Sequence, residues 1–188
     1  GWWLREARDN VYPRQLTLTD VKILEERVPY YQRLTENHKA EFRTKLTRVL
    51  YTKEFLGMGG IEEVTPEMEM LTGATIVMVT FGWKRIRLPH FSKILIYPNA
   101  YYSTITKSYH RGEVNPKYGL IVVSWSCFLE GLKDDRDGIN LGIHEIAHAL
   151  KLENQIYSNG ESDFFNPEAW LKYQQFVKIE QEKITQNQ

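Results

Sequence analysis

The chain has 188 residues, and its 24 lysines and arginines are balanced by 24 aspartates and glutamates. A single core in a chain of this length buries roughly 70% of the surface that the unfolded chain exposes. We therefore predict one globular domain over residues 1–188. Nucleic-acid binders usually carry an excess of positive charge for contacts with phosphates. Because the charge here is balanced, nucleic acid is not an expected partner.

The cysteine content and the apolar runs bear on location. Cys127 is the only cysteine, and a single thiol is compatible with the reducing cytoplasm. The longest near-apolar run covers residues 73–83, shorter than the about 18 residues of a membrane span. We predict a cytoplasmic protein with no membrane span in this chain. The alternative is a tether through a removed N-terminal segment, since Trp2-Trp3-Leu4-Arg5 would suit a segment that flanks a membrane helix.

The first predicted elements are helices. Four apolar residues share one face of a helix over about 36–52, and Thr35 is its expected N-cap. A second helix is predicted from Thr65-Pro66-Glu67, which combines a cap, a first-turn proline and an acidic residue. Residues 71–81 are apolar almost all round, so this helix should be buried, with Gly82 as its stop.

Short β-branched and aromatic runs at 94–97 and 120–125 predict two strands, separated by a polar stretch rich in tyrosine. The pattern then returns to helix over about 139–152. Asn166-Pro167-Glu168 repeats the helix-start signature. Helices and a small sheet in separate blocks indicate an α+β fold that is mainly helical.

The helix over 139–152 carries the motif His144-Glu145-Ile146-Ala147-His148. Four residues on a helix turn through about 400° and rise about 6 Å, so the two imidazoles project from one face. In that position they can occupy two corners of a zinc tetrahedron. Glu145 lies about 100° further round and can reach a water at the metal. The pattern therefore predicts Zn²⁺ held by His144 and His148, with Glu145 as the general base of a hydrolase.

A structural interpretation competes with this one. The apolar neighbours Ile143, Ile146, Ala147 and Leu150 suit a buried helix of any kind. In that interpretation the two histidines are hydrogen-bonded core residues, and Glu145 lies at the surface.

Several segments resemble the Mlc titration factor A family of bacterial zinc peptidases. These segments are Phe55-Leu56-Gly57-Met58-Gly59-Gly60-Ile61-Glu62, Val64-Thr65, Ile94 to Pro98, Val123-Ser124-Trp125 and Asn140 to Leu150, with Asn154, Gly160, Phe165 and Trp170 as looser matches. The resemblance implies a zincin-like, gluzincin-like fold and a peptide or protein substrate. It also implies zinc ligation by His144 and His148, Glu145 as the general base, and a glutamate on a later helix as third protein ligand.

That later helix has no recognisable counterpart before Gln188, so the third ligand is unknown and is expected to be a glutamate beyond residue 188. Four acidic residues inside the chain are possible substitutes: Glu153, Glu161, Asp163 and Glu168. Glu153 is about 180° round the helix from His144, so it can share the metal only if the helix ends before it. None of the four is assigned as a ligand.

Two further features remain open in the sequence. One of the tyrosines among Tyr97, Tyr101, Tyr102, Tyr109 and Tyr118 could stabilise an oxyanion, although packing explains most of them. Either predicted strand could present an edge to which an extended peptide adds.

Two functions compete. The first is hydrolysis of peptide bonds at a mononuclear zinc site. The second is a non-catalytic or weakly catalytic binding protein that sequesters a transcriptional repressor, as the namesake of the family does. The intact motif favours the enzyme, because a binding surface has no need of all three residues.

Overall fold

The computed structural model describes residues 15–83, 88–103, 107–133 and 140–157. The chain divides into two compact units, Gly1–Leu150 and Lys151–Gln188. The single domain predicted over 1–188 stays a prediction. None of the helices in the described ranges has the length and apolarity that crossing a bilayer requires.

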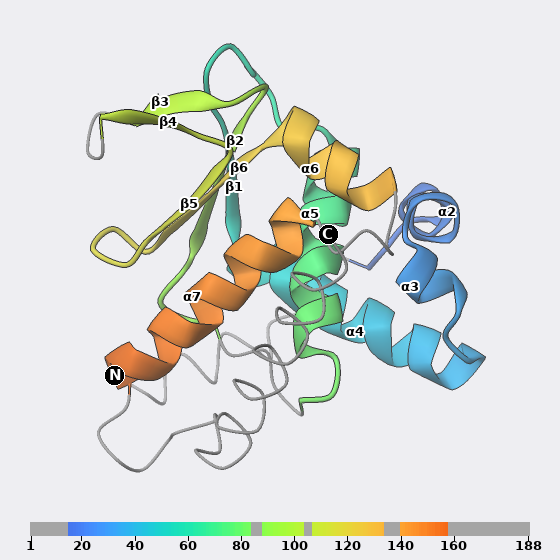
Figure 1. Ribbon diagram of the computed structural model, residues 1–188. Helices are drawn as coiled ribbons and strands as arrows, with labels where there is room; N and C mark the ends of the chain where they lie inside the picture. The colour runs from blue at the N-terminus through green and yellow to red at the C-terminus, as the bar shows by residue number, and fades with distance from the viewer. Residues whose placement is uncertain (1–14, 84–87, 104–106, 134–139, 158–188) are drawn as a thin grey trace, which may run out of the picture. The chain divides into compact units, whose positions relative to one another are not determined.

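The described elements are helices with a small sheet, as the pattern of apolar residues along the chain predicts (Figure 1). The helices are α2 (Leu18–Arg27), α3 (Pro29–Gln32), α4 (Glu36–Thr52), α5 (Pro66–Thr80), α6 (Trp125–Lys133) and α7 (Leu141–Tyr157). The strands are β1 (Glu54–Gly57), β2 (Lys93–Tyr97), β3 (Tyr101–Ser103), β4 (Ser108–His110), β5 (Gly112–Asn115) and β6 (Leu120–Ser124). The last helix expected from Asn166 lies outside the described residues.

The larger sheet has the strand order β1-β2-β6-β5. Strands β1, β2 and β6 are parallel, and β5 runs antiparallel to β6. Strands β3 and β4 form a separate two-stranded hairpin. The expectation that β2 or β6 offers an edge is wrong, because both are inner strands. Among the described strands the edges are β1 and β5, which are short and lack the apolar runs by which strands are recognised.

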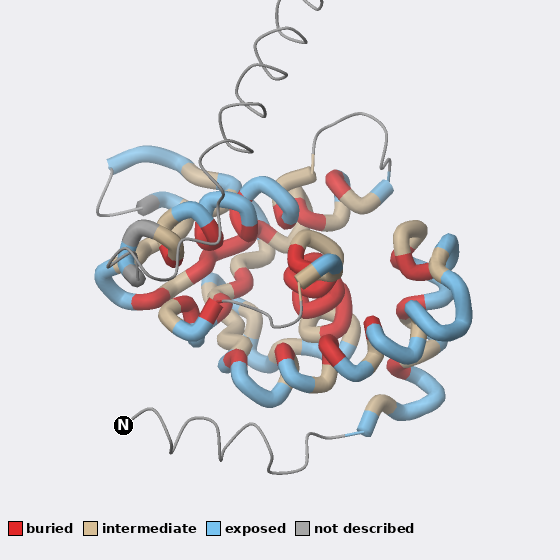
Figure 2. Tube along the Cα trace, turned by 90° about the horizontal axis from the view of Figure 1, so that it is seen from below, coloured by how far each residue is buried: buried red, intermediate tan, exposed pale blue. Residues whose placement is uncertain are grey.

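Helices α4 and α5 begin where the sequence predicts, because Thr35 and Thr65 each accept a hydrogen bond from a backbone N–H in the first turn of their helix. Helix α5 is buried along most of its length, and the buried residues concentrate there and in the inner strands (Figure 2). A Cβ on Gly73 of α5 would lie 2.9 Å from Leu46 Cδ1. The glycine therefore allows α4 to approach α5 closely.

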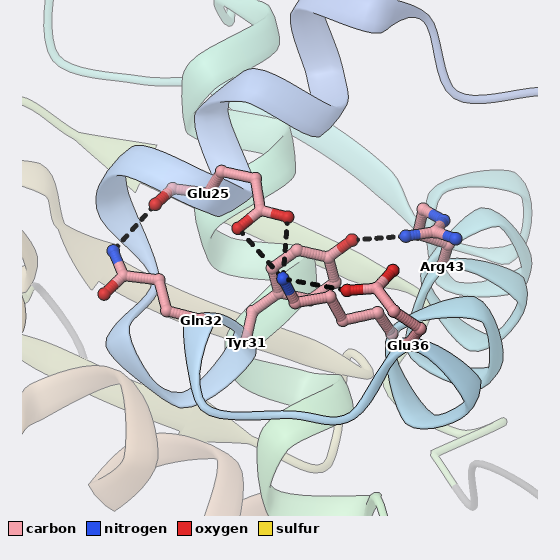
Figure 3. A network of polar contacts seen from close by, with 6 residues as sticks. Glu25, Tyr31, Gln32, Glu36 and Arg43 are labelled. Carbon is pink, nitrogen blue, oxygen red and sulfur yellow. Dashed lines mark hydrogen bonds and ion pairs between the residues drawn. The ribbon is translucent and has the colours of Figure 1, made fainter.

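A polar network joins the N-terminal helices (Figure 3). The Arg43 guanidinium donates to the hydroxyl of the buried Tyr31 at 2.6 Å. Lys39 Nζ lies 3.0 Å from a carboxylate oxygen of Glu25, and the Gln32 amide donates to the Glu25 carbonyl. Exposed ion pairs of this kind contribute at most about 1 kcal/mol each. The apolar contacts beneath them therefore supply most of the stability of this helical layer.

Helix α7 is capped by Asn140, whose Oδ1 accepts from the Ile143 N–H at 2.9 Å. The Asn140 amide also donates to the carbonyl of Gly131 in α6, at 2.8 Å. The helix was predicted over about 139–152 and extends to Tyr157, while Ile139 lies outside the described residues. The cap ties the start of α7 to the end of α6, and this fixes the rotation of the first turns of α7.

Gly142 lets α7 pack closely against two other helices. A Cβ there would lie 2.5 Å from Phe128 Cε2 and 3.2 Å from Thr75 Cγ2. Phe128 is 1% exposed, so its ring has no room to move away. We expect Gly142→Ala to lower the free energy of unfolding by about 1–2 kcal/mol, because overpacking outweighs the better helix propensity of alanine. Chemical denaturation measures this.

Gly82→Ala is the matched control, since no atom of the described residues lies within 4 Å of a Cβ at Gly82. We expect this variant to stay within about 0.5 kcal/mol of the wild type. Equal stability of the two variants would show that α7 can shift to accommodate the methyl group.

Candidate functional site

The first turns of α7 present two imidazoles at the surface. His144 and His148 are both exposed, their Nε2 atoms are 3.0 Å apart, and their ring centroids are 4.5 Å apart. The structure thus brings together the two nitrogens that the four-residue spacing places on one face. The remaining histidines in the described residues lie elsewhere, at His38 on α4, His90 before β2 and His110 on β4.

The pair of nitrogens suits a small tetrahedral metal ion. Zinc with Zn–N bonds of about 2.0–2.1 Å holds two neighbouring ligand atoms about 3.3 Å apart, close to the 3.0 Å between the two imidazoles. Among the described residues, no group of three or more histidine, cysteine, aspartate or glutamate side chains could hold a metal ion. The described residues therefore offer the two imidazoles and no third ligand beside them.

Glu145 differs sharply in burial from the two histidines that flank it. Its residue is 7% exposed, and its carboxyl group lies against the backbone of Gly112 in β5. The structural interpretation of the motif, with core histidines and a surface Glu145, is wrong, because the burial of the three residues is the reverse. Helix α7 thus carries, between two exposed histidines in the sequence, a glutamate whose carboxyl group is buried against β5.

A second carboxyl group, that of Glu113, and the hydroxyl of Tyr101 lie near Glu145. The Tyr101 hydroxyl donates to Glu113 Oε2 at 3.2 Å, and the Tyr101 ring stacks on Tyr97 with centroids 4.4 Å apart. Burial raises the pKa of Glu145 to about 7, and the negative charge of Glu113 adds to this shift. Burial, followed by the charge of Glu113, also raises the pKa of Tyr101 above its ordinary value. Burial and the charge of Glu113 thus both favour the protonated form of Glu145.

Of the five tyrosines that the sequence leaves open, Tyr101 is the one whose electrostatic environment includes Glu145. Tyr102 and Tyr109 pair with each other on the β3–β4 hairpin and are exposed, as is Tyr118. The Tyr101 hydroxyl already donates its hydrogen to Glu113, and this hydrogen bond connects β3 of the hairpin to β5.

Sequence reasoning missed Gly112 and Glu113. Both lie in a short edge strand within the tyrosine-rich stretch, which carries no strand signal. They belong to the site only because the sheet places β5 beside α7, and no local pattern reports such a placement.

The acidic residues considered as substitutes for the third ligand have different outcomes. Helix α7 continues through Glu153, which is 1% exposed, so the condition that the helix ends before this residue is not met. Glu161, Asp163 and Glu168 lie outside the described residues. The expectation of a glutamate beyond residue 188 stays a prediction.

Comparison with known proteins supports the catalytic interpretation at the level of the family. An uncharacterised protein of Synechocystis sp. is 24% identical over 161 residues, which cover 80% of this chain and 58% of that protein. The chain thus spans little more than half the length of that relative. Neither this relative nor the family model supports a transcriptional repressor as a partner. The family model of the glucose-regulated metallo-peptidase M90 matches residues 2–188. The resemblance found in the sequence is confirmed, and the chain belongs to this metallopeptidase family.

Proposed function

We propose that this protein is a zinc-dependent peptidase with a zincin-like active site, in which His144 and His148 hold the metal and Glu145 is the general base. One observation carries the proposal. The Nε2 atoms of the exposed His144 and His148 lie 3.0 Å apart, and Glu145, which lies between them in the sequence, is buried. Structural histidine pairs do not need a buried acid beside them. A hydrolase needs all three groups.

Zinc, when bound, would polarise the scissile carbonyl and make a water molecule more acidic. The chain itself supplies the proton transfers. Glu145 takes a proton from the attacking water as the new C–O bond forms, and gives it to the amide nitrogen as the C–N bond breaks. A carboxylate withdrawn from water is a stronger base than an exposed one. The burial of Glu145 against β5 therefore supports this role.

Strand β5 is the proposed docking site for the substrate. Among the strands of the described residues it pairs with β6 alone, so its outer edge offers backbone groups to an extended peptide. Its residue Gly112 touches the Glu145 carboxyl. A peptide added along this edge would bring a backbone carbonyl close to the base.

The cytoplasmic location of the protein rests on its cysteine content alone and stays a prediction.

The ligand set is tested by the zinc affinity of the 188-residue chain and of a form with further C-terminal residues. We expect the shorter form to bind more weakly, because two imidazoles leave the remaining positions to water, and an anionic ligand adds Coulombic attraction. A competition titration with a chelator measures both affinities. Equal affinities would place the third ligand within residues 149–188 and refute its location beyond Gln188.

A further inference from the structure

The contact between Gly112 and Glu145 carries an inference that rests on the proposed function. We propose that Gly112 is a positioning residue, whose missing side chain creates the space in which the carboxyl group of the general base lies. Gly112 begins β5, at the edge of the sheet that faces the first turns of α7 (Figure 1).

The distances show how little space there is. A Cβ on Gly112 would lie 2.5 Å from Glu145 Oε1 and 2.7 Å from both Cδ and Cγ of the same side chain. Carbon atoms in contact are normally about 3.5–4.0 Å apart. The clash therefore involves the outer half of the Glu145 side chain, and a small rotation of the carboxyl group alone would not relieve it.

Backbone conformation does not explain the glycine. The described glycines with positive φ are Gly59, Gly60 and Gly119, and Gly112 is not among them. Gly112 instead takes part in the regular antiparallel register of β5 opposite Val123. Other residues can adopt this conformation, and glycine weakens a strand, so the sheet alone favours a larger residue here. The space beside Glu145 is the remaining reason for glycine.

The strand cannot easily move away from α7. The Ser124 N–H donates to the Arg111 carbonyl at 2.7 Å, immediately before Gly112. On the other side, Glu113 accepts the hydrogen bond from Tyr101, and Val123 opposite Gly112 is 2% exposed. Because the backbone is held from both sides, a methyl group at position 112 would displace the Glu145 side chain.

Gly112→Ala should therefore lower kcat by about 10²-fold, because a displacement of about 1 Å at a reacting group has effects of this size. We expect zinc content and KM to stay close to those of the wild type, because neither histidine is touched and the added methyl group points at Glu145, which leaves the backbone groups of β5 free to bind the substrate. In crystal structures of the wild type and the variant, the Glu145 carboxyl carbon should differ in position by about 1 Å or more.

Gly82→Ala is the control, since it adds the same methyl group where no described atom is within 4 Å. It should leave all of these quantities unchanged. Unchanged kcat in Gly112→Ala, or an unmoved carboxyl group, would overturn the proposal. Loss of zinc from the folded variant would overturn it as well, because the glycine would then serve the metal site.

A further variant covers the case in which Gly112→Ala fails to fold. Adding Glu145→Ala removes the atoms that the new methyl group meets, so the double variant should regain the melting temperature of Glu145→Ala. Failure of the double variant to fold would refute a role through Glu145. The proposed function is tested separately. If Glu145→Gln leaves turnover intact while the crystal structures show the displaced carboxyl group, the general base is wrong and the packing of Gly112 against Glu145 stands.

Discussion

Glu145→Gln is expected to lower peptidase turnover by about 10² to 10⁴-fold, the usual contribution of general acid–base catalysis. The amide keeps the shape of the side chain and fits the same space beside Gly112, but it cannot accept a proton. Zinc content should be unchanged, because Glu145 is not a proposed ligand. The measurement pairs turnover on a peptide substrate with elemental analysis, for a form of the protein that binds zinc stoichiometrically.

Glu153→Gln is a matched control, because Glu153 is also a buried glutamate of α7, at 1% exposure. We expect it to change the melting temperature more than the turnover per folded molecule. A purely structural Glu145 would behave in the same way as Glu153. Undiminished turnover in a zinc-replete Glu145→Gln variant would rule out the proposed mechanism.

Local signals in the sequence were sufficient where a helix depends on its own residues. Thr35 and Thr65 lie at the N-caps that the pattern predicts, and the apolar run after Thr65 forms the buried helix α5. The strands β2 and β6 were found for the same reason, since both are inner strands rich in β-branched residues.

The missed elements are those that depend on partners far away in the chain. Strand β5 has the sequence Gly-Glu-Val-Asn, which forms a strand because β6 pairs with it and not because of intrinsic propensity. Strand β1 is equally short, and its partner β2 follows only after α5 in the chain. The candidate site divides in the same way: the helical motif was readable from its spacing, whereas Gly112 and Glu113 required the sheet.

His144→Ala and His148→Ala are each expected to abolish stoichiometric zinc binding. Each substitution removes one of the two imidazole nitrogens that lie 3.0 Å apart, and the lone nitrogen that remains cannot compete with water and a chelator. Both side chains are exposed, so the metal-free variants should unfold within about 0.5 kcal/mol of the metal-free wild type. Elemental analysis after dialysis, together with chemical denaturation, measures the two effects.

His38→Ala provides the comparison for these variants, because His38 is an exposed histidine on α4 whose ring lies against Phe81. It should keep the zinc content of the wild type. Tightly bound zinc in both the His144 and the His148 variants would disprove the assignment of the ligands.

Loss of the fold together with the metal would show that zinc stabilises the domain. That result is not expected, because the core consists of fully buried apolar residues, among them Ile76, Ile96 and Ile121, whereas both imidazoles are exposed. Peptidase activity should disappear in step with the zinc, since Glu145 alone cannot polarise the carbonyl that the water attacks.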